Sequence, residues 1–231
     1  MQKHLREEFL YALKDTFDAY NEYGARSNKK LISIHSWFAR KIIANLGGSY
    51  FCRSLGLNGE YKIEGKYYTK AEDITIFNKF EPNSSKPIVA LSFKFVTSNY
   101  AQNSNNYFEN LLGETANIRR VNVGFAHFLV LRGHTPYYDK AAGGERGNLK
   151  KTEILSEEHI EKYIKLFKDA DYPHKPDVLG MAIVDFDRKN VPYFVNLQEL
   201  GLSSDAIMIV EDCFSVETFI EKVSALCKLK T

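Results

Sequence analysis

The chain has 231 residues, of which 44% are hydrophobic and 26% charged, and its formal net charge is +2. These values are typical of a folded domain with a sizeable core and exclude a disordered or fibrous protein. No apolar run approaches the roughly 20 residues that a membrane span requires. Three scattered cysteines without a CxxC pair exclude a disulfide framework and a cysteine-rich zinc site. We therefore expect a cytoplasmic protein without a membrane partner.

The small net charge conceals an uneven distribution along the chain. Residues 86–151 contain 9 Lys and Arg against 4 Asp and Glu, whereas residues 152–231 contain 9 against 15. A basic middle segment is compatible with a polyanionic partner. A chance asymmetry of solvated faces explains the same counts equally well.

Two helices are predicted at the start of the chain. Apolar residues recur at helical spacing in residues 4–20 and again in residues 31–46, and Gly47-Gly48 ends the second helix. The polar residues 21–30 connect them. Residues 1–58 are therefore expected to form a helical N-terminal subregion.

The periodicity then changes to that of β-strands. Residues 59–68 predict a short hairpin, and residues 87–95 form the clearest strand, which is mostly apolar and so expected at the centre of a sheet. Ser92 and Lys94 interrupt this strand two positions apart. Because side chains alternate along a strand, both must point to the same face.

The rest of the chain alternates helices and strands. The predicted elements are a helix over residues 105–120, a strand over 123–131, a mobile basic loop over 137–151, a helix capped by Ser156, strands over 178–186 and 206–210, and a last helix capped by Ser215. This order predicts an α/β fold with a mixed central β-sheet flanked by helices. We expect a single domain of residues 1–231, with residues 59–132 as its core and residues 133–231 as a C-terminal α/β portion.

Three residues of this core suggest a chemistry. Asp73 lies at the base of one strand, Lys94 lies on the neighbouring strand, and Glu109 lies near the start of the next helix. Mg²⁺ prefers one or two carboxylates together with water and phosphate oxygens. A lysine can hold the attacking water or help to deprotonate it, while the metal offsets charge on a phosphate. Metal-assisted phosphodiester hydrolysis needs this combination.

Each of these residues also has an ordinary structural explanation. Lys94 could be an edge residue with its ammonium group in solvent, Asp73 could end a hairpin, and Glu109 could favour the first turn of a helix. If the strand is central, however, Lys94 needs a partner, because burying an unpaired charge is costly. The three residues in this order favour the catalytic interpretation.

Asp73 with Ser92-Phe93-Lys94 resembles the core of the PD-(D/E)XK nucleases, in particular type II restriction endonucleases. The sequence departs from the motif at Glu72, where the motif has proline, and at Ser92, where it has an acid. Some restriction enzymes of this superfamily carry serine there and supply the carboxylate from the following helix, where Glu109 falls. The asparagine-rich run over residues 105–114 is similar to the start of that helix. The resemblance covers roughly residues 60–132.

The resemblance implies a restriction-endonuclease-like fold and a Mg²⁺ cofactor. Asp73 and Glu109 would bind the metal, Lys94 would position the nucleophilic water, and Ser92 would line the site. The alternates for the second acid are Glu114 and Glu72, followed by Glu22 and Glu8 of the N-terminal helix.

Two polar segments are candidates for DNA contact, although each also fits an ordinary surface loop. Asparagine and glutamine can pair with adenine edges in the major groove, and the candidates are Asn99, Gln102, Asn103, Asn105 and Asn106. Lysine and arginine suit phosphate contact, and the candidates are Lys140, Arg146, Lys150 and Lys151.

The expected function is that of a Mg²⁺-dependent, sequence-specific endonuclease of double-stranded DNA. Cutting both strands of a palindrome requires two active sites related by a two-fold axis, so a homodimer is expected. One alternative is a non-catalytic DNA-binding module on the same fold, which Ser92 permits. Another is a nuclease that acts on repair or recombination structures. Metal dependence and the effect of Lys94→Ala separate an enzyme from a binding module.

Overall fold

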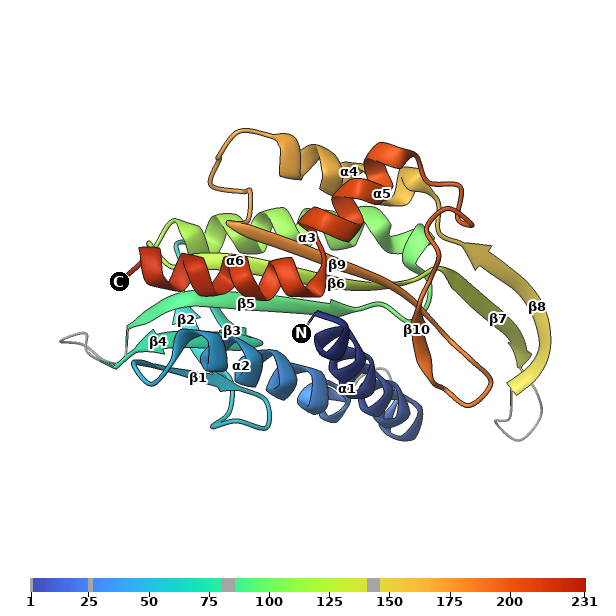
Figure 1. The fold of residues 1–231 in the computed structure, drawn as a ribbon, viewed down its shortest axis with the longest axis horizontal. Coiled ribbons are helices and arrows are strands. Elements are labelled where there is room, and N and C mark those ends of the chain that lie inside the picture. Colours follow the sequence, from blue (N-terminus) through green and yellow to red (C-terminus); the bar gives the residue numbers. More distant parts are fainter. Residues whose placement is uncertain (1, 25–26, 80–85, 141–145) are drawn as a thin grey trace.

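A mixed sheet of six strands lies at the centre of the molecule, in the order β1–β4–β5–β6–β9–β10 (Figure 1). The computed structural model describes residues 2–24, 27–79, 86–140 and 146–231. The strands are β1 (Tyr50–Ser54), β4 (Ile74–Asn78), β5 (Pro87–Phe95), β6 (Gly124–Arg132), β9 (Val178–Phe186) and β10 (Pro192–Phe194). The central strands β5, β6 and β9 run parallel, and the outer ones pair antiparallel.

Helices cover both faces of this sheet (Figure 1). One face carries α1 (Gln2–Tyr23), α2 (Ile32–Leu46) and α6 (Val216–Leu229), and the other carries α3 (Tyr100–Arg119), α4 (Glu157–Lys168) and α5 (Ser204–Met208). Single turns η1 (Asn28–Leu31) and η2 (Ile209–Cys213) complete the helical segments. The central strands are almost entirely buried, as expected for parallel strands between two helical layers. The predicted α/β fold with a mixed central sheet flanked by helices is confirmed.

A hairpin of β2 (Tyr61–Glu64) and β3 (Thr69–Glu72) lies against α3. The buried Asn117 of α3 accepts hydrogen bonds from the backbone N–H groups of Tyr67 (2.8 Å) and Tyr68 (3.2 Å) and donates one to the Tyr68 carbonyl (2.9 Å). Gly65 allows this approach, since a Cβ there would lie 2.2 Å from the Asn117 side chain. The hairpin is thereby anchored to the helix that follows β5.

A second hairpin, of β7 (His134–Lys140) and β8 (Arg146–Ile154), projects beyond one end of the sheet (Figure 1). Glu153 joins its base to the start of α3, because its carboxylate accepts hydrogen bonds from the Ala101 N–H (3.1 Å) and the Tyr137 hydroxyl (3.0 Å). The predicted mobile loop over residues 137–151 is therefore wrong for residues 137–140 and 146–151, which form the strands, while residues 141–145 lie outside the described part of the chain. Both faces of the hairpin carry exposed residues such as Leu149, so no apolar alternation marks its strands.

Two further predicted elements differ from the structure. Helix α3 begins at Tyr100, five residues before its predicted start at Asn105, because the polar first turns carry little apolar periodicity. Residues 206–210, predicted as a strand, lie in α5 and η2. The short strands β1 and β10 were not predicted. The caps at Ser156 and Ser215 are confirmed.

None of the helices that the structure describes has the length and apolarity needed to cross a membrane.

Candidate active site

Three neighbouring elements bring charged and polar side chains together on the α3 side of the sheet. We call this group the acid–lysine cluster, and its members are Lys70 and Glu72 of β3, Asp73 between β3 and β4, Ser92 and Lys94 of β5, and Glu114 of α3.

Asp73 is held at the sheet by the backbone of β5. Strand β4 pairs with β5 so that Ile74 lies opposite Leu91, which places the preceding Asp73 beside the next residues of β5. Its Oδ2 accepts a hydrogen bond of 2.6 Å from the N–H of Phe93, the residue between Ser92 and Lys94. The structure thus joins Asp73 to the Ser92-Phe93-Lys94 segment.

Ser92 and Lys94 point to the same face of β5, toward α3. The Ser92 hydroxyl donates a hydrogen bond of 3.1 Å to Glu114 Oε2, and Lys94 Nζ lies 3.7 Å from Glu114 Oε1. The Lys94 side chain is 33% exposed, so its ammonium group has both a carboxylate partner and access to solvent. A lysine on a central strand is accommodated in this way.

Glu114, and not Glu109, is the acid that α3 brings to Lys94. Their separation of five positions along α3 rotates the side chain by about 140° around the helix. Glu109 is exposed, and its charge acts on Lys162 of α4. The expectation that Glu109 reaches back over the sheet edge to Lys94 therefore differs from the structure, and the alternate Glu114 occupies that place.

Two ammonium groups hold Glu114 in its ionised form. Burial by itself would raise the pKa of Glu114, but the charges of Lys94 and Lys70 outweigh it and hold the pKa below its ordinary value. Lys70 Nζ lies 2.8 Å from Glu114 Oε1. This carboxylate therefore has both lysines at Oε1 and the Ser92 hydroxyl at Oε2.

Glu72 is the most deeply buried member of the cluster. Its side chain is 0% exposed, and neither carboxyl oxygen has a hydrogen-bond partner among the described residues. The closest cation in a described ion pair is Lys70, whose Nζ lies 3.9 Å from Glu72 Oε2. Burial raises the pKa of Glu72 to about 8, so near neutral pH this carboxyl is largely protonated.

We expect Glu72→Gln to stabilise the metal-free protein increasingly as pH rises from 4.5 to 8. In this window the folded protein retains a proton that the unfolded chain releases, because the pKa of Glu72 is about 8 against an ordinary 4.5. Glu72 therefore lowers the free energy of unfolding by up to about 1.4 kcal/mol for each pH unit of increase, and glutamine at this position removes that contribution. Urea denaturation of both proteins in EDTA at pH 4.5, 6 and 8 measures it. A difference that is constant across pH would contradict the assignment.

Two buried histidines border the cluster and were not anticipated from the sequence. His127 of β6 is the register partner of Ser92, and burial lowers its pKa to about 3, so its ring is neutral. His35 of α2 lies on the opposite face of the sheet, with its ring 5.4 Å from that of Phe93. Lys70 was also missed. The alternation of Lys70 and Glu72 along β3 was the one sequence signal for it.

The weaker acid candidates lie outside the cluster. Glu8 of α1 forms an ion pair with Lys41 and accepts a hydrogen bond of 3.4 Å from the Trp37 ring nitrogen. Glu22 is exposed at the end of α1.

The candidate DNA-contacting residues occupy the start of α3 and the β7–β8 hairpin. Asn99 precedes α3 with a positive φ of 56°, and Gln102, Asn103, Asn105 and Asn106 lie on its first turns and not in a loop. Lys162 donates a hydrogen bond of 2.7 Å to Asn105. Lys150 and Lys151 are exposed on β8, while the side chains of Lys140 and Arg146 lie outside the described residues.

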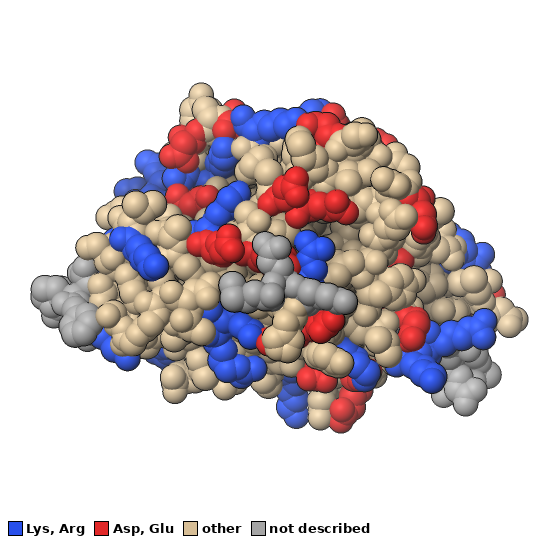
Figure 2. Space-filling view, viewed as in Figure 1, with Lys and Arg blue, Asp and Glu red and all other residues tan. Residues whose placement is uncertain are grey.

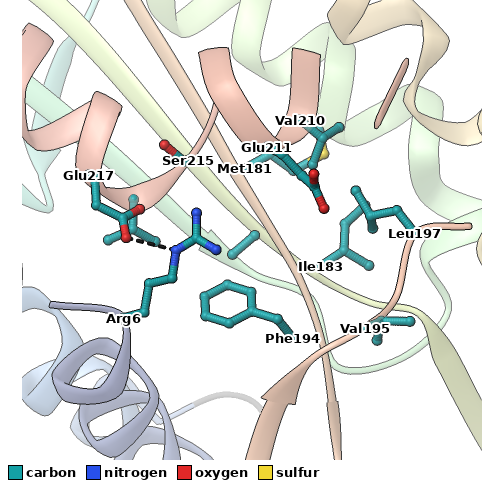
Figure 3. Close-up of a pocket in the computed structure, with 12 residues that line it drawn as sticks. Arg6, Met181, Ile183, Phe194, Val195, Leu197, Val210, Glu211, Ser215 and Glu217 are labelled. Carbon is teal, nitrogen blue, oxygen red and sulfur yellow. Dashed lines mark hydrogen bonds and ion pairs between the residues drawn. The ribbon is translucent and has the colours of Figure 1, made fainter. Parts of the chain in front are cut away.

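A separate small pocket lies between α1, β9, β10 and the start of α6 (Figure 3). Arg6 and Glu217 form an ion pair of 2.7 Å at its wall. Its volume of about 60 Å³ admits a few water molecules. It shares no residue with the acid–lysine cluster and is too small for a substrate.

The cluster contains carboxylates, which are the protein ligands that Mg²⁺ prefers. Asp73 and Glu114 supply carboxylate oxygens, and Mg²⁺ in proteins needs only one or two of these besides water and phosphate. The buried oxygens of Glu72 also lack a described donor, but this carboxyl is largely protonated near neutral pH. In the described ranges, however, no three His, Cys, Asp or Glu side chains are grouped so that they could hold a metal ion, and Lys70 already pairs with Glu114.

Comparison with protein-family models, with curated proteins and with solved structures gives no match for this chain. The interpretation of the cluster therefore depends on the residues and their geometry.

Proposed function

We propose that this protein is a Mg²⁺-dependent, sequence-specific endonuclease of double-stranded DNA, similar to the type II restriction enzymes of the PD-(D/E)XK superfamily. The hydrogen bond from Ser92 to Glu114 supports this most strongly. It puts a carboxylate directly beside the serine that replaces the acid of the motif, on the same face as Lys94. One group therefore contains Asp73 from the segment before β4, Glu114 from α3 and Lys94 from β5.

Each residue has a defined role in this proposal. Asp73 and Glu114 would hold the metal, which when bound would polarise a phosphodiester oxygen and offset the charge that develops on phosphorus. Lys94 would hold the attacking water and assist its deprotonation. Glu114 keeps the Lys94 ammonium group in place, and the partly exposed Lys94 side chain lets water reach it.

The position of the candidate DNA contacts agrees with this role. Strands β5 and β6 are parallel, Lys94 is the next-to-last residue of β5, and β7 starts two residues after β6 ends. The hairpin and the start of α3 therefore extend from the sheet end near Lys94. On the face seen in Figure 2, basic and acidic side chains are mixed, so a DNA-binding surface would have to be local.

The proposal includes a homodimer, because cleavage of both strands at a palindromic site needs two such clusters. The decisive experiment incubates the purified protein with long duplex DNA of known sequence, in Mg²⁺ and in EDTA. Discrete fragments that form only with Mg²⁺ are the expected result. Binding without cleavage would favour the DNA-binding module, and cleavage only of branched or flapped DNA would favour a repair or recombination nuclease.

The hairpin should contribute to DNA affinity through its exposed lysines. We expect the double replacement Lys150→Ala and Lys151→Ala to weaken binding and to reduce the slope of log affinity against log salt by about 2, since each phosphate contact contributes about 1. Fluorescence anisotropy with labelled duplex DNA at several salt concentrations measures the slope. Lys228→Ala with Lys230→Ala, at the end of α6, is the matched control, and an equal change in both double variants would contradict a role for the hairpin.

A further inference from the structure

Lys70 has no role in the chemistry proposed above, yet it makes the shortest ion pair of the cluster. Its Nζ lies 2.8 Å from Glu114 Oε1 and 3.9 Å from Glu72 Oε2, and its side chain is 22% exposed. The hairpin that carries Lys70 is anchored to α3 by Asn117, so this position is a consequence of the fold.

The carboxylate that Lys70 neutralises is the one that the proposed function assigns to the metal. Glu114 Oε1 faces both Lys70 and Lys94, and Glu114 Oε2 accepts the Ser92 hydroxyl hydrogen. A divalent cation bound to Glu114 would lie within a few ångströms of the Lys70 ammonium group. Like charges at such a distance repel, because Glu114 is only 13% exposed and water screens the two charges less than it does in bulk. Both cations cannot keep their closest contact with this carboxylate.

We propose that Lys70 is a resident cation of the metal-free site, which a divalent ion must displace from Glu114. In the absence of metal, Lys70 balances the charge of Glu114 and keeps Glu114 directed at Ser92 and Lys94. On displacement, the ammonium group becomes free to pair with another anion, and a DNA phosphate is the anion that the proposed function supplies. Metal loading and substrate binding are thereby coupled. This inference depends on the proposed function.

The test measures direct Mn²⁺ binding to the unmodified protein and its variants. The loss of the electron paramagnetic resonance signal of free Mn²⁺ reports the binding. We expect Lys70→Met to bind Mn²⁺ at least about tenfold more tightly than the unmodified protein, because the competing charge is gone. Lys62→Met is the matched control, since Lys62 is an exposed lysine of the same hairpin, and its affinity should not change. Lys70→Arg keeps the charge and should retain weak binding.

The same variants give a second readout in thermal denaturation. Metal-free Lys70→Met should melt at a lower temperature than the unmodified protein, and Mn²⁺ should raise its melting temperature by more. If Lys70→Met does not fold, Lys70→Gln replaces it with a shorter polar side chain, and the same increase in affinity is expected. Unchanged or weaker Mn²⁺ binding by the folded variant, or no binding by any protein, overturns the inference.

DNA cleavage separates the two proposals. If the unmodified protein cleaves DNA with Mg²⁺ while Lys70→Met binds Mn²⁺ no more tightly, only the role of Lys70 fails. If the unmodified protein cleaves no DNA in Mg²⁺, the nuclease proposal fails whatever the Mn²⁺ affinities are.

Discussion

Lys94→Ala should slow Mg²⁺-dependent DNA cleavage by several orders of magnitude while leaving DNA binding within a few-fold of the unmodified protein. Lys94 is the only lysine of the cluster that lies on β5 beside Ser92, and its Nζ is 3.7 Å from Glu114. Positioned groups that assist proton transfer contribute about 10²–10⁴-fold to rate, and we expect a loss in this range. Supercoiled plasmid cleavage gives the rate, and gel shift in Ca²⁺ gives binding.

The matched control is Lys62→Ala, which removes an exposed lysine from the nearby hairpin. It should cleave at the rate of the unmodified protein. If Lys94→Ala cleaves as fast as Lys62→Ala, Lys94 does not position the water, and the proposed assignment of the site is wrong. A parallel loss of DNA binding would instead indicate that Lys94 contacts the phosphate in the ground state.

Glu114→Gln should reduce cleavage by at least about 100-fold, whereas Glu109→Gln should have little effect. Glutamine has nearly the size of glutamate, so it preserves packing and can still accept the Ser92 hydrogen bond. It removes the negative charge that offsets Lys70 and Lys94 and that would bind the metal. The cleavage rates of both variants over a range of Mg²⁺ concentrations measure the effect, with a higher Mg²⁺ requirement expected for Glu114→Gln.

Glu109→Gln serves as the matched control, because both changes lie on α3 and remove one carboxylate. Its side chain is exposed on another face of the helix. A larger loss for Glu109→Gln than for Glu114→Gln would show that another arrangement of α3 operates in the complex with DNA. Equal and small losses would remove α3 from the site altogether.

The local pattern of the sequence was sufficient for the α/β architecture and for one part of the cluster. Residues 87–95 read as a buried central strand because their apolar content is continuous, and the structure confirms β5 over the same residues. The period of two along a strand was enough to put Ser92 and Lys94 on one face. Side-chain alternation is a property of the backbone and needs no tertiary information.

The tertiary structure decided which partners these two residues meet. Asp73 joins them because antiparallel pairing of β4 with β5 brings its carboxylate to the Phe93 N–H. Glu114 joins them because the rotation of α3 is set by packing against the sheet and by the bonds of Asn117 to the β2–β3 hairpin. Spacing along the chain favoured Glu109, since it carries no information on the direction of a helical side chain relative to a separate strand.

Long-range pairing likewise decided the β7–β8 hairpin and the place of Lys70. The hairpin has few buried residues, so its strands show no apolar period, and only pairing between residues such as His134 and Ile154 defines them. Lys70 reaches Glu114 across 44 residues of sequence, through a hairpin that folds onto a helix. The sequence alone determined the helices and strands in which the spacing of apolar residues follows the buried side of the element. Contacts between elements, which depend on register, helix rotation and docking, were determined only when the chain folded.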